Sequence, residues 1–95
     1  MKDFQHYKPR NEKEKFLFKS FLKLKSEQEI ANFLRDLLTV KELEEFANRL
    51  EMAKLLKKGI PYVKIAEKLG VSTTTVTRTA HWLFRGSGGY DKVLE

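Results

Sequence analysis

Residues 60–82 read IPYVKIAEKLGVSTTTVTRTAHW and have the residue pattern of a helix-turn-helix. In the first of its two helices, Ile65, Ala66 and Leu69 fall on one face, and the small side chain of Ala66 lets a second helix approach closely. The second helix presents a facing apolar stripe, which consists of Val76, Ala80 and Leu83. We therefore predict a helix-turn-helix over about residues 60–85.

The turn between these helices has its own sequence signals. Gly70 can adopt the left-handed backbone that a corner requires, and Val71 fills the angle between the helices. Ser72 can cap the amino end of the second helix. Few other arrangements need all three residue types at this spacing.

The outward positions of the second helix are polar, and no acidic residue lies between Gly70 and Arg85. Free amide groups at a helix amino end attract phosphate, and hydroxyl and guanidinium groups bind phosphates or base edges. The predicted DNA contacts of this helix are Ser72, Thr73, Thr74, Thr75, Thr77, Arg78 and His81. Flanking basic residues predicted to meet phosphates are Lys57, Lys58 and Lys64. The alternative is that the threonine run only makes a solvated helix start.

Composition is compatible with a nucleic-acid partner. The 95 residues include 19 Lys and Arg against 13 Asp and Glu, which gives a net charge of +6. A basic protein gains affinity for a polyanion by releasing counterions, although the same charge also serves solubility. A chain of this length buries only about two thirds of its unfolded surface when alone, so we expect further burial against a partner.

Several kinds of site and location are not expected. The chain has no cysteine, and His6 and His81 are far apart in sequence, so we expect neither a disulfide nor a metal site. The apolar runs are too short to span a membrane, and the first ten residues lack the apolar core of a secretory signal. We therefore expect a cytoplasmic protein.

The rest of the chain is predicted to be helical, which makes the fold class all-α with about six helices. Residues 1–10 are expected to form a flexible N-terminal arm, and residues 11–95 a single helical domain. One helix is predicted from about Asn11 to Lys25, with apolar side chains on more than one stripe. Capping boxes at Ser26 and Thr39 begin two more, the last of which reaches Lys58.

The chain after Arg85 allows two interpretations. Residues 86–89 read GSGG, which ends the preceding helix, and residues 90–94 can then form a short last helix. The alternative is a flexible linker followed by a frayed tail.

The order of these features resembles the Trp repressor superfamily. Residues 37–39 read LLT at the start of a long helix, Asn48 and Arg49 lie midway along it, KKG ends it, and LGVSTTTVTR follows at residues 69–78. The tail RGSGGY at residues 85–90 resembles the short YerC/YecD-like branch. These core motifs span about half of the chain, and nearly all of it resembles the family when the first two helices are included.

The resemblance implies an intertwined homodimer, in which the first three helices and the last one of two chains build a shared core. Two recognition helices would then meet successive major grooves of double-stranded DNA, if they are about 34 Å apart. The operator would accordingly be near-palindromic.

The resemblance also implies an effector pocket. In the family, two arginines flank a bound tryptophan, and the matching positions here are Arg49 and Arg78, with Thr39 near the pocket. The family's small residues on the recognition helix are replaced by Thr79 and Trp82. We hypothesise that the Trp82 ring occupies the space of a free indole, so that L-tryptophan is not a corepressor here. The alternatives are core packing for Trp82 and a solvated or salt-bridged Arg49.

Two functions remain in competition at this point. The first is a sequence-specific transcriptional regulator, acting as a repressor that occupies its site. The second is a helical interaction module that binds RNA or an acidic protein. An enzyme is not expected, because the acids lie along a helix exterior and the sequence has no Ser-His-Asp set and no phosphate loop with its lysine.

Overall fold

The computed structural model describes residues 4–95, and within them it contains six α-helices and no strand. This confirms the all-α fold class. The helices are α1 (Glu12–Phe21), α2 (Glu27–Leu37), α3 (Val40–Lys57), α4 (Tyr62–Leu69), α5 (Thr73–Arg85) and α6 (Gly89–Leu94). The contacts group the chain into two compact units, Tyr7–Glu44 and Met1–His6 with Glu45–Glu95. The single domain over residues 11–95 stays a prediction.

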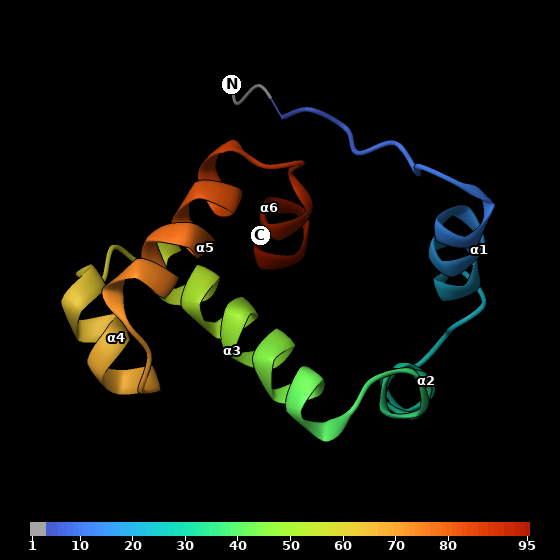
Figure 1. Ribbon diagram of the computed structural model, residues 1–95, viewed down its shortest axis with the longest axis horizontal. Coiled ribbons are helices and arrows are strands. Elements are labelled where there is room, and N and C mark those ends of the chain that lie inside the picture. The colour runs from blue at the N-terminus through green and yellow to red at the C-terminus, as the bar shows by residue number, and fades with distance from the viewer. Residues whose placement is uncertain (1–3) are drawn as a thin grey trace. The chain divides into compact units, whose positions relative to one another are not determined.

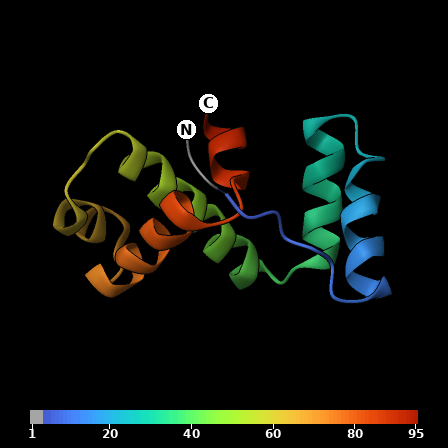
Figure 2. The same ribbon diagram turned by 90° about the horizontal axis from the view of Figure 1, so that it is seen from above.

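The unit Tyr7–Glu44 contains α1 and α2, which lie side by side as an antiparallel pair (Figure 2). The rings of Phe21 and Phe33 meet edge to face with centroids 5.4 Å apart. The predicted capping box at Ser26 is present, since Ser26 Oγ accepts a hydrogen bond of 3.1 Å from the Glu29 amide. Neither helix buries a single residue in one chain, although both have an apolar face.

Helix α1 ends at Phe21, four residues before the predicted end at Lys25. The amides of residues 22–24 instead donate to carbonyls three residues back, as in a tight 3₁₀-type turn. Leu24 therefore belongs to the connection to α2, although its apolar side chain continues the α1 pattern in the sequence.

The arm ahead of α1 is attached to that helix at one point. Glu14 accepts hydrogen bonds from the Tyr7 hydroxyl at 2.8 Å, from the Arg10 amide at 3.0 Å and from Arg10 Nε at 2.7 Å. The hydrogen bonds from the Arg10 side chain and backbone, followed by that from Tyr7, lower the pKa of Glu14 from 4.5 to about 2. Flexibility of the rest of the arm stays a prediction.

This depressed pKa predicts an acid-sensitive attachment. The ionised Glu14 stabilises the contact fully above its ordinary pKa of 4.5, and this contribution is lost as the pH falls toward the folded value of about 2. We expect an NMR titration of the Glu14 carboxyl carbon to show a midpoint near the folded pKa of about 2, well below the ordinary value of 4.5. A midpoint for Glu14 at the ordinary value would contradict the contact.

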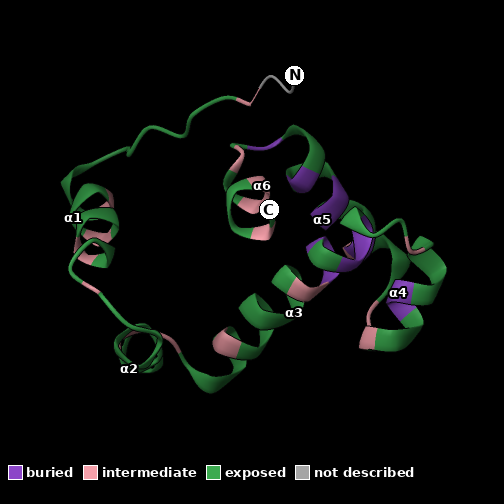
Figure 3. Ribbon diagram, turned by 180° about the vertical axis from the view of Figure 1, so that it is seen from behind, coloured by how far each residue is buried: buried purple, intermediate pink, exposed green. Residues whose placement is uncertain are grey.

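The core of the second unit lies where the C-terminal part of α3 meets α4 and α5 (Figures 1 and 3). Ile65 of α4 and Val76 and Leu83 of α5 are almost completely buried, as the helix-turn-helix pattern predicts. Helix α3 contributes Met52, Ala53, Leu55 and Leu56. The apolar residues earlier in α3, among them Phe46 and Leu50, remain exposed in one chain.

The turn between α4 and α5 has the predicted geometry. Gly70 adopts φ +67° and ψ +37°, the left-handed conformation that glycine accepts without strain. The Val71 amide then donates to the Ala66 carbonyl at 3.0 Å, and Ser72 Oγ accepts from the Thr75 amide at 3.1 Å. Val71 is half-buried against the core. Helix α5 therefore starts at a fixed point relative to α4.

Candidate functional site

The outer face of α5 is exposed and has no acidic side chain. Its inner side chains, Val76, Thr79, Ala80 and Leu83, are buried in the core. The exposed positions include the predicted residues Thr73, Thr74, Thr77, Arg78 and His81. Because one side of the helix is anchored and the amino end is capped, these side chains are presented from a rigid support.

The hydroxyls of residues 72–77, at the amino end of α5, fall into two groups. Those of Ser72, Thr75 and Thr77 already bond within the helix start: Ser72 and Thr75 pair at 3.0 Å, and Thr77 Oγ1 donates to the Thr73 carbonyl at 2.9 Å. No side-chain hydrogen bond is found for Thr73 or Thr74 within residues 4–95, so these two can turn their hydroxyls to a partner. Thr75 is only half-exposed, which makes it the least accessible of the predicted contacts.

The two larger polar side chains of this face differ in their surroundings. Arg78 is exposed, and no ion pair involving it is found in the described part of the chain. His81 lies edge to face against the Trp82 ring, with centroids 5.4 Å apart. The Arg78 guanidinium is thus available to a base edge or a phosphate.

Three lysines flank the helix-turn-helix, as the sequence predicts, but they are not equivalent. Lys58 and Lys64 are exposed, and within residues 4–95 neither forms an ion pair. Lys57 Nζ lies 3.4 Å from Asp91 Oδ1 of α6. Its charge is therefore already paired within the chain.

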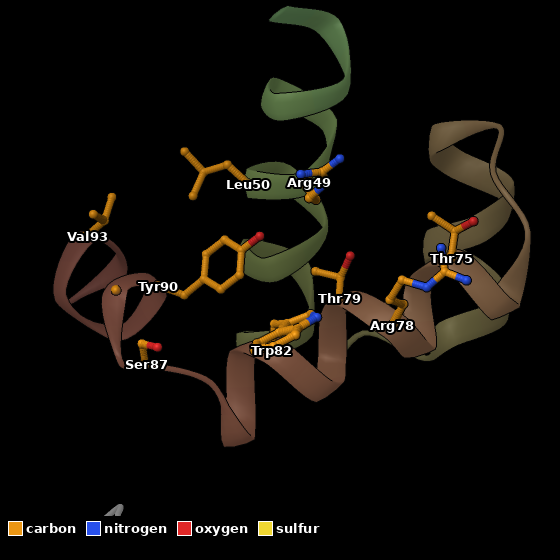
Figure 4. A pocket seen from close by; sticks show the side chains of 10 residues that line it. Arg49, Leu50, Thr75, Arg78, Thr79, Trp82, Ser87, Tyr90 and Val93 are labelled. Atoms are coloured by element: carbon orange, nitrogen blue, oxygen red, sulfur yellow. The ribbon is translucent and has the colours of Figure 1, made fainter. Parts of the chain in front are cut away.

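A pocket of about 770 Å³ lies between α3, α5 and α6 (Figure 4). Its lining consists of Arg49, Leu50, Thr75, Arg78, Thr79, Trp82, Ser87, Gly89, Tyr90 and Val93. Most of the lining is apolar, and the two guanidinium groups supply positive charge. This combination is typical of sites for small molecules.

Four of the five residues predicted for an effector pocket line this cavity: Arg49, Arg78, Thr79 and Trp82. Thr79 is buried, with its hydroxyl 3.8 Å from Met52 Sδ, so it faces the core as well as the pocket. Trp82 is 57% exposed and forms one wall, which leaves open space beside the ring. Arg49 also lies over the Phe46 ring at 5.4 Å from its centroid.

The fifth, Thr39, is not among the lining residues in one chain. Thr39 belongs to the other compact unit, where it forms a capping box with Glu42. The Thr39 amide donates to Glu42 Oε1 at 2.9 Å, and Thr39 Oγ1 accepts from the Glu42 amide at 3.1 Å. Its role in one chain is to begin α3.

The chain after Arg85 also lines the pocket, which was not predicted from the sequence. Part of the chain after Arg85 forms one wall of the pocket, because α6 is a helix and not a frayed tail. The residues of this wall are Ser87, Gly89, Tyr90 and Val93. Tyr90 and Leu94 pack against the core, while Val93 turns to the pocket. The spacing of the apolar residues Tyr90, Val93 and Leu94 is the sequence signal that predicts an amphipathic last turn.

Residues 4–95 contain no helix long and apolar enough to cross a membrane. They also contain no group of three or more His, Asp or Glu side chains that could hold a metal ion.

Comparison with known proteins gives consistent matches. The sequence profile of the family described as Trp repressor protein matches residues 12–95. An uncharacterized protein, YerC of Bacillus subtilis, is 39% identical over 79 residues, which cover 83% of this chain and 76% of that protein.

Two crystal structures have a similar fold. One is a TrpR-like protein from Eubacterium eligens, with a TM-score of 0.81, 37% identity, and coverage of 88% of this chain and 87% of that chain. The other is a candidate Trp repressor from Staphylococcus aureus, with a TM-score of 0.80, 34% identity, and coverage of 90% and 85%.

Proposed function

Because the chain belongs to the Trp repressor family and is of the YerC type, we propose that it is a transcriptional regulator that binds a specific DNA operator as a homodimer. It acts by occupying the site, most simply as a repressor, and involves no chemical step. The observation that supports this most is the outer face of α5, which presents Arg78, Thr73 and Thr74 and has no acidic side chain. The inner face of the same helix is buried, and its amino end is capped.

The positions of these residues indicate which of them contact bases and which contact phosphates. Arg78 reads a base edge by paired hydrogen bonds, with Thr77 and His81 beside it in the major groove. The capped amino end of α5 and the lysines Lys58 and Lys64 bind phosphates, which orients the domain without reading sequence.

The homodimer is supported by the amount of apolar surface that one chain leaves uncovered. Leu22 is 82% exposed and Phe16 is 73% exposed. The other large exposed apolar side chains of helices α1 to α3 are Phe18, Phe21, Ile30, Leu37, Val40, Phe46 and Leu50. Soluble monomers rarely expose so many large apolar side chains, whereas a shared core of two chains would bury them.

The proposal is tested by selecting bound fragments from genomic DNA and measuring their affinities. We expect the selected fragments to share a near-palindromic motif with half-sites about one helical turn apart, and affinity to fall steeply with salt. Binding of random and selected DNA with equal affinity would contradict a specific operator. Tighter binding to single-stranded RNA would favour the alternative, a helical interaction module.

The pocket between α3, α5 and α6 supports a second proposal, a site for a small effector. The arginines Arg49 and Arg78 favour an anionic group, and the apolar lining favours an apolar body that fits the space left beside the Trp82 ring (Figure 4). Since Arg78 also lies on the outer face of α5, a ligand bound there would act directly on the DNA-reading side chain.

We expect L-tryptophan not to bind this pocket. Thr79 and Trp82 are larger than the residues that the family resemblance expects at these positions, and the Trp82 ring already forms one wall. Calorimetry should show no stoichiometric heat of binding, and the Trp82→Ala variant serves as a comparison with a larger pocket. Uptake of one L-tryptophan per chain at micromolar affinity by the unmodified protein would show the expectation to be wrong.

A further inference from the structure

Helix α6 has few local features that keep it helical. It has six residues, whereas isolated helices shorter than about 12 residues are marginal in water. Its N-cap is Gly88, which has no side chain to cap the helix start. Residues 86–89 read GSGG, a composition typical of flexible chain. Contacts with other parts of the protein must therefore hold α6 in place.

Three residues within α6 make such contacts. Tyr90 and Leu94 pack against the core, and Asp91 Oδ1 lies 3.4 Å from Lys57 Nζ of α3. The residue at which the helix begins, Gly88, is contacted by a different segment.

That segment is the N-terminal arm, from the opposite end of the chain. A Cβ built on Gly88 would lie 2.9 Å from Cδ2 and 3.1 Å from Cγ of Phe4, so the Phe4 ring packs directly on the Gly88 backbone. Phe4 is half-buried, whereas residues 5–10 are exposed. The contacts group Phe4 with α6 in one compact unit, and the arm begins beside this helix (Figure 2).

Two properties restrict this position to glycine. Gly88 has φ +87°, a left-handed conformation that residues with a side chain rarely adopt. In addition, carbon atoms in contact pack about 3.5–4.0 Å apart, so a Cβ at residue 88 would displace the Phe4 ring. Gly59 shares only the first property: its φ is +80°, but no atom of the described residues lies within 4 Å of a Cβ built there.

We propose that the N-terminal arm is a strap, whose Phe4 ring holds α6 at its first residue. The ring is covered only when the arm and the helix start are both in place, so the order of each depends on the other. A strap takes the place of the flexible arm that the sequence predicts at Phe4. The proposal concerns the folded chain itself and does not depend on DNA binding.

The first test measures amide hydrogen exchange in α6 of the full chain by NMR. The Lys92 amide is the reporter, because it donates to the Gly88 carbonyl at 3.2 Å. In Phe4→Ala we expect this amide to exchange about three- to tenfold faster, since a half-buried phenylalanine contributes roughly half as much as a fully buried one. Gln5→Ala, at the exposed neighbouring position, is the matched control and should leave the exchange unchanged. Equal exchange in both variants would show that Phe4 does not hold α6.

The second test starts from the glycine. Gly88→Ala should release Phe4, so that chymotrypsin cleaves after Phe4 about three- to tenfold faster than in the unmodified protein. Gly59→Ala introduces similar backbone strain without a steric conflict, and we expect it to leave this cleavage rate unchanged. Equal cleavage rates in the two glycine variants would overturn the strap.

A double variant separates the steric conflict from the backbone strain at residue 88. In the Phe4→Ala background the new Cβ meets no ring, so Gly88→Ala should lower the melting temperature less than it does in the unmodified protein. Losses that simply add would mean that Phe4 and Gly88 do not interact, and the strap would be wrong.

Discussion

Replacing Phe16 with aspartate is expected to convert the proposed dimer into a monomer and to abolish tight operator binding. Phe16 is 73% exposed in one chain, and burying a phenylalanine contributes about 1.5–3 kcal/mol. In a two-fold dimer the substitution acts twice, and it also places two carboxylates in an apolar interface. Losing the physical link between two reading heads should lower operator affinity by about 10²–10⁴-fold.

The matched control for this experiment is Gln28→Asp. It also adds one negative charge to an exposed side chain of the unit Tyr7–Glu44, but Gln28 lies on a polar position and bonds to Asn32 at 2.9 Å. We expect this variant to remain dimeric by light scattering. If Phe16→Asp keeps the mass and the operator affinity of the unmodified protein, the α1 face does not form the interface.

The second large effect is expected for Arg78→Ala. Arg78 is exposed near the middle of α5 and has no ion pair within residues 4–95, so its removal breaks no internal ion pair. Loss of a bidentate base contact costs about 1–3 kcal/mol, which is roughly 5- to 150-fold in affinity for the operator. Affinity for random DNA should fall much less. The ratio of operator affinity to random-DNA affinity should therefore decrease.

Arg85→Ala provides the comparison, because it removes the same charge from the carboxyl end of α5. We expect it to weaken operator and random DNA by the same small factor. Equal losses of specificity for Arg78→Ala and Arg85→Ala would mean that Arg78 contributes only charge and does not read a base.

The helix-turn-helix could be predicted from the sequence because its signals are local. The left-handed Gly70, the Ser72 cap and the buried Ile65 and Val76 each follow from residue type and spacing over a few positions. The capping boxes at Ser26 and Thr39 begin their helices for the same reason.

Other features depend on contacts that spacing does not determine. After Phe21 the hydrogen bonds change from the α-helical to the 3₁₀-type pattern. The apolar side chain of Leu24 fits the helical spacing, so the sequence pattern gives no sign of this change. The position of α6 depends on packing against a core whose residues come from α3, α4 and α5. The pairing of Lys57 with Asp91, 34 residues apart, likewise could not be predicted from either residue.

The same distinction explains the uneven outcome for the predicted pocket. All five residues had been assigned through the family resemblance. Arg78, Thr79 and Trp82 share α5 and Arg49 lies on α3, and these four line the pocket in one chain. The part of the pocket lining that comes from the chain after Arg85 was not predicted. The glycines of residues 86–89 do not determine the direction in which the chain continues. Thr39 had been assigned to the pocket in the same way, and in one chain it caps α3, as its capping box predicts.

The central claim is that two copies of this chain together hold a pair of α5 helices for DNA. Light scattering of the protein in dilute buffer, alone and with a selected operator duplex, tests it most directly. Since one chain has a mass of 11.2 kDa, we predict about 22 kDa for the free protein. With DNA, we predict a complex of two chains per duplex. A stable, folded species of one chain that leaves the duplex unbound would contradict the account.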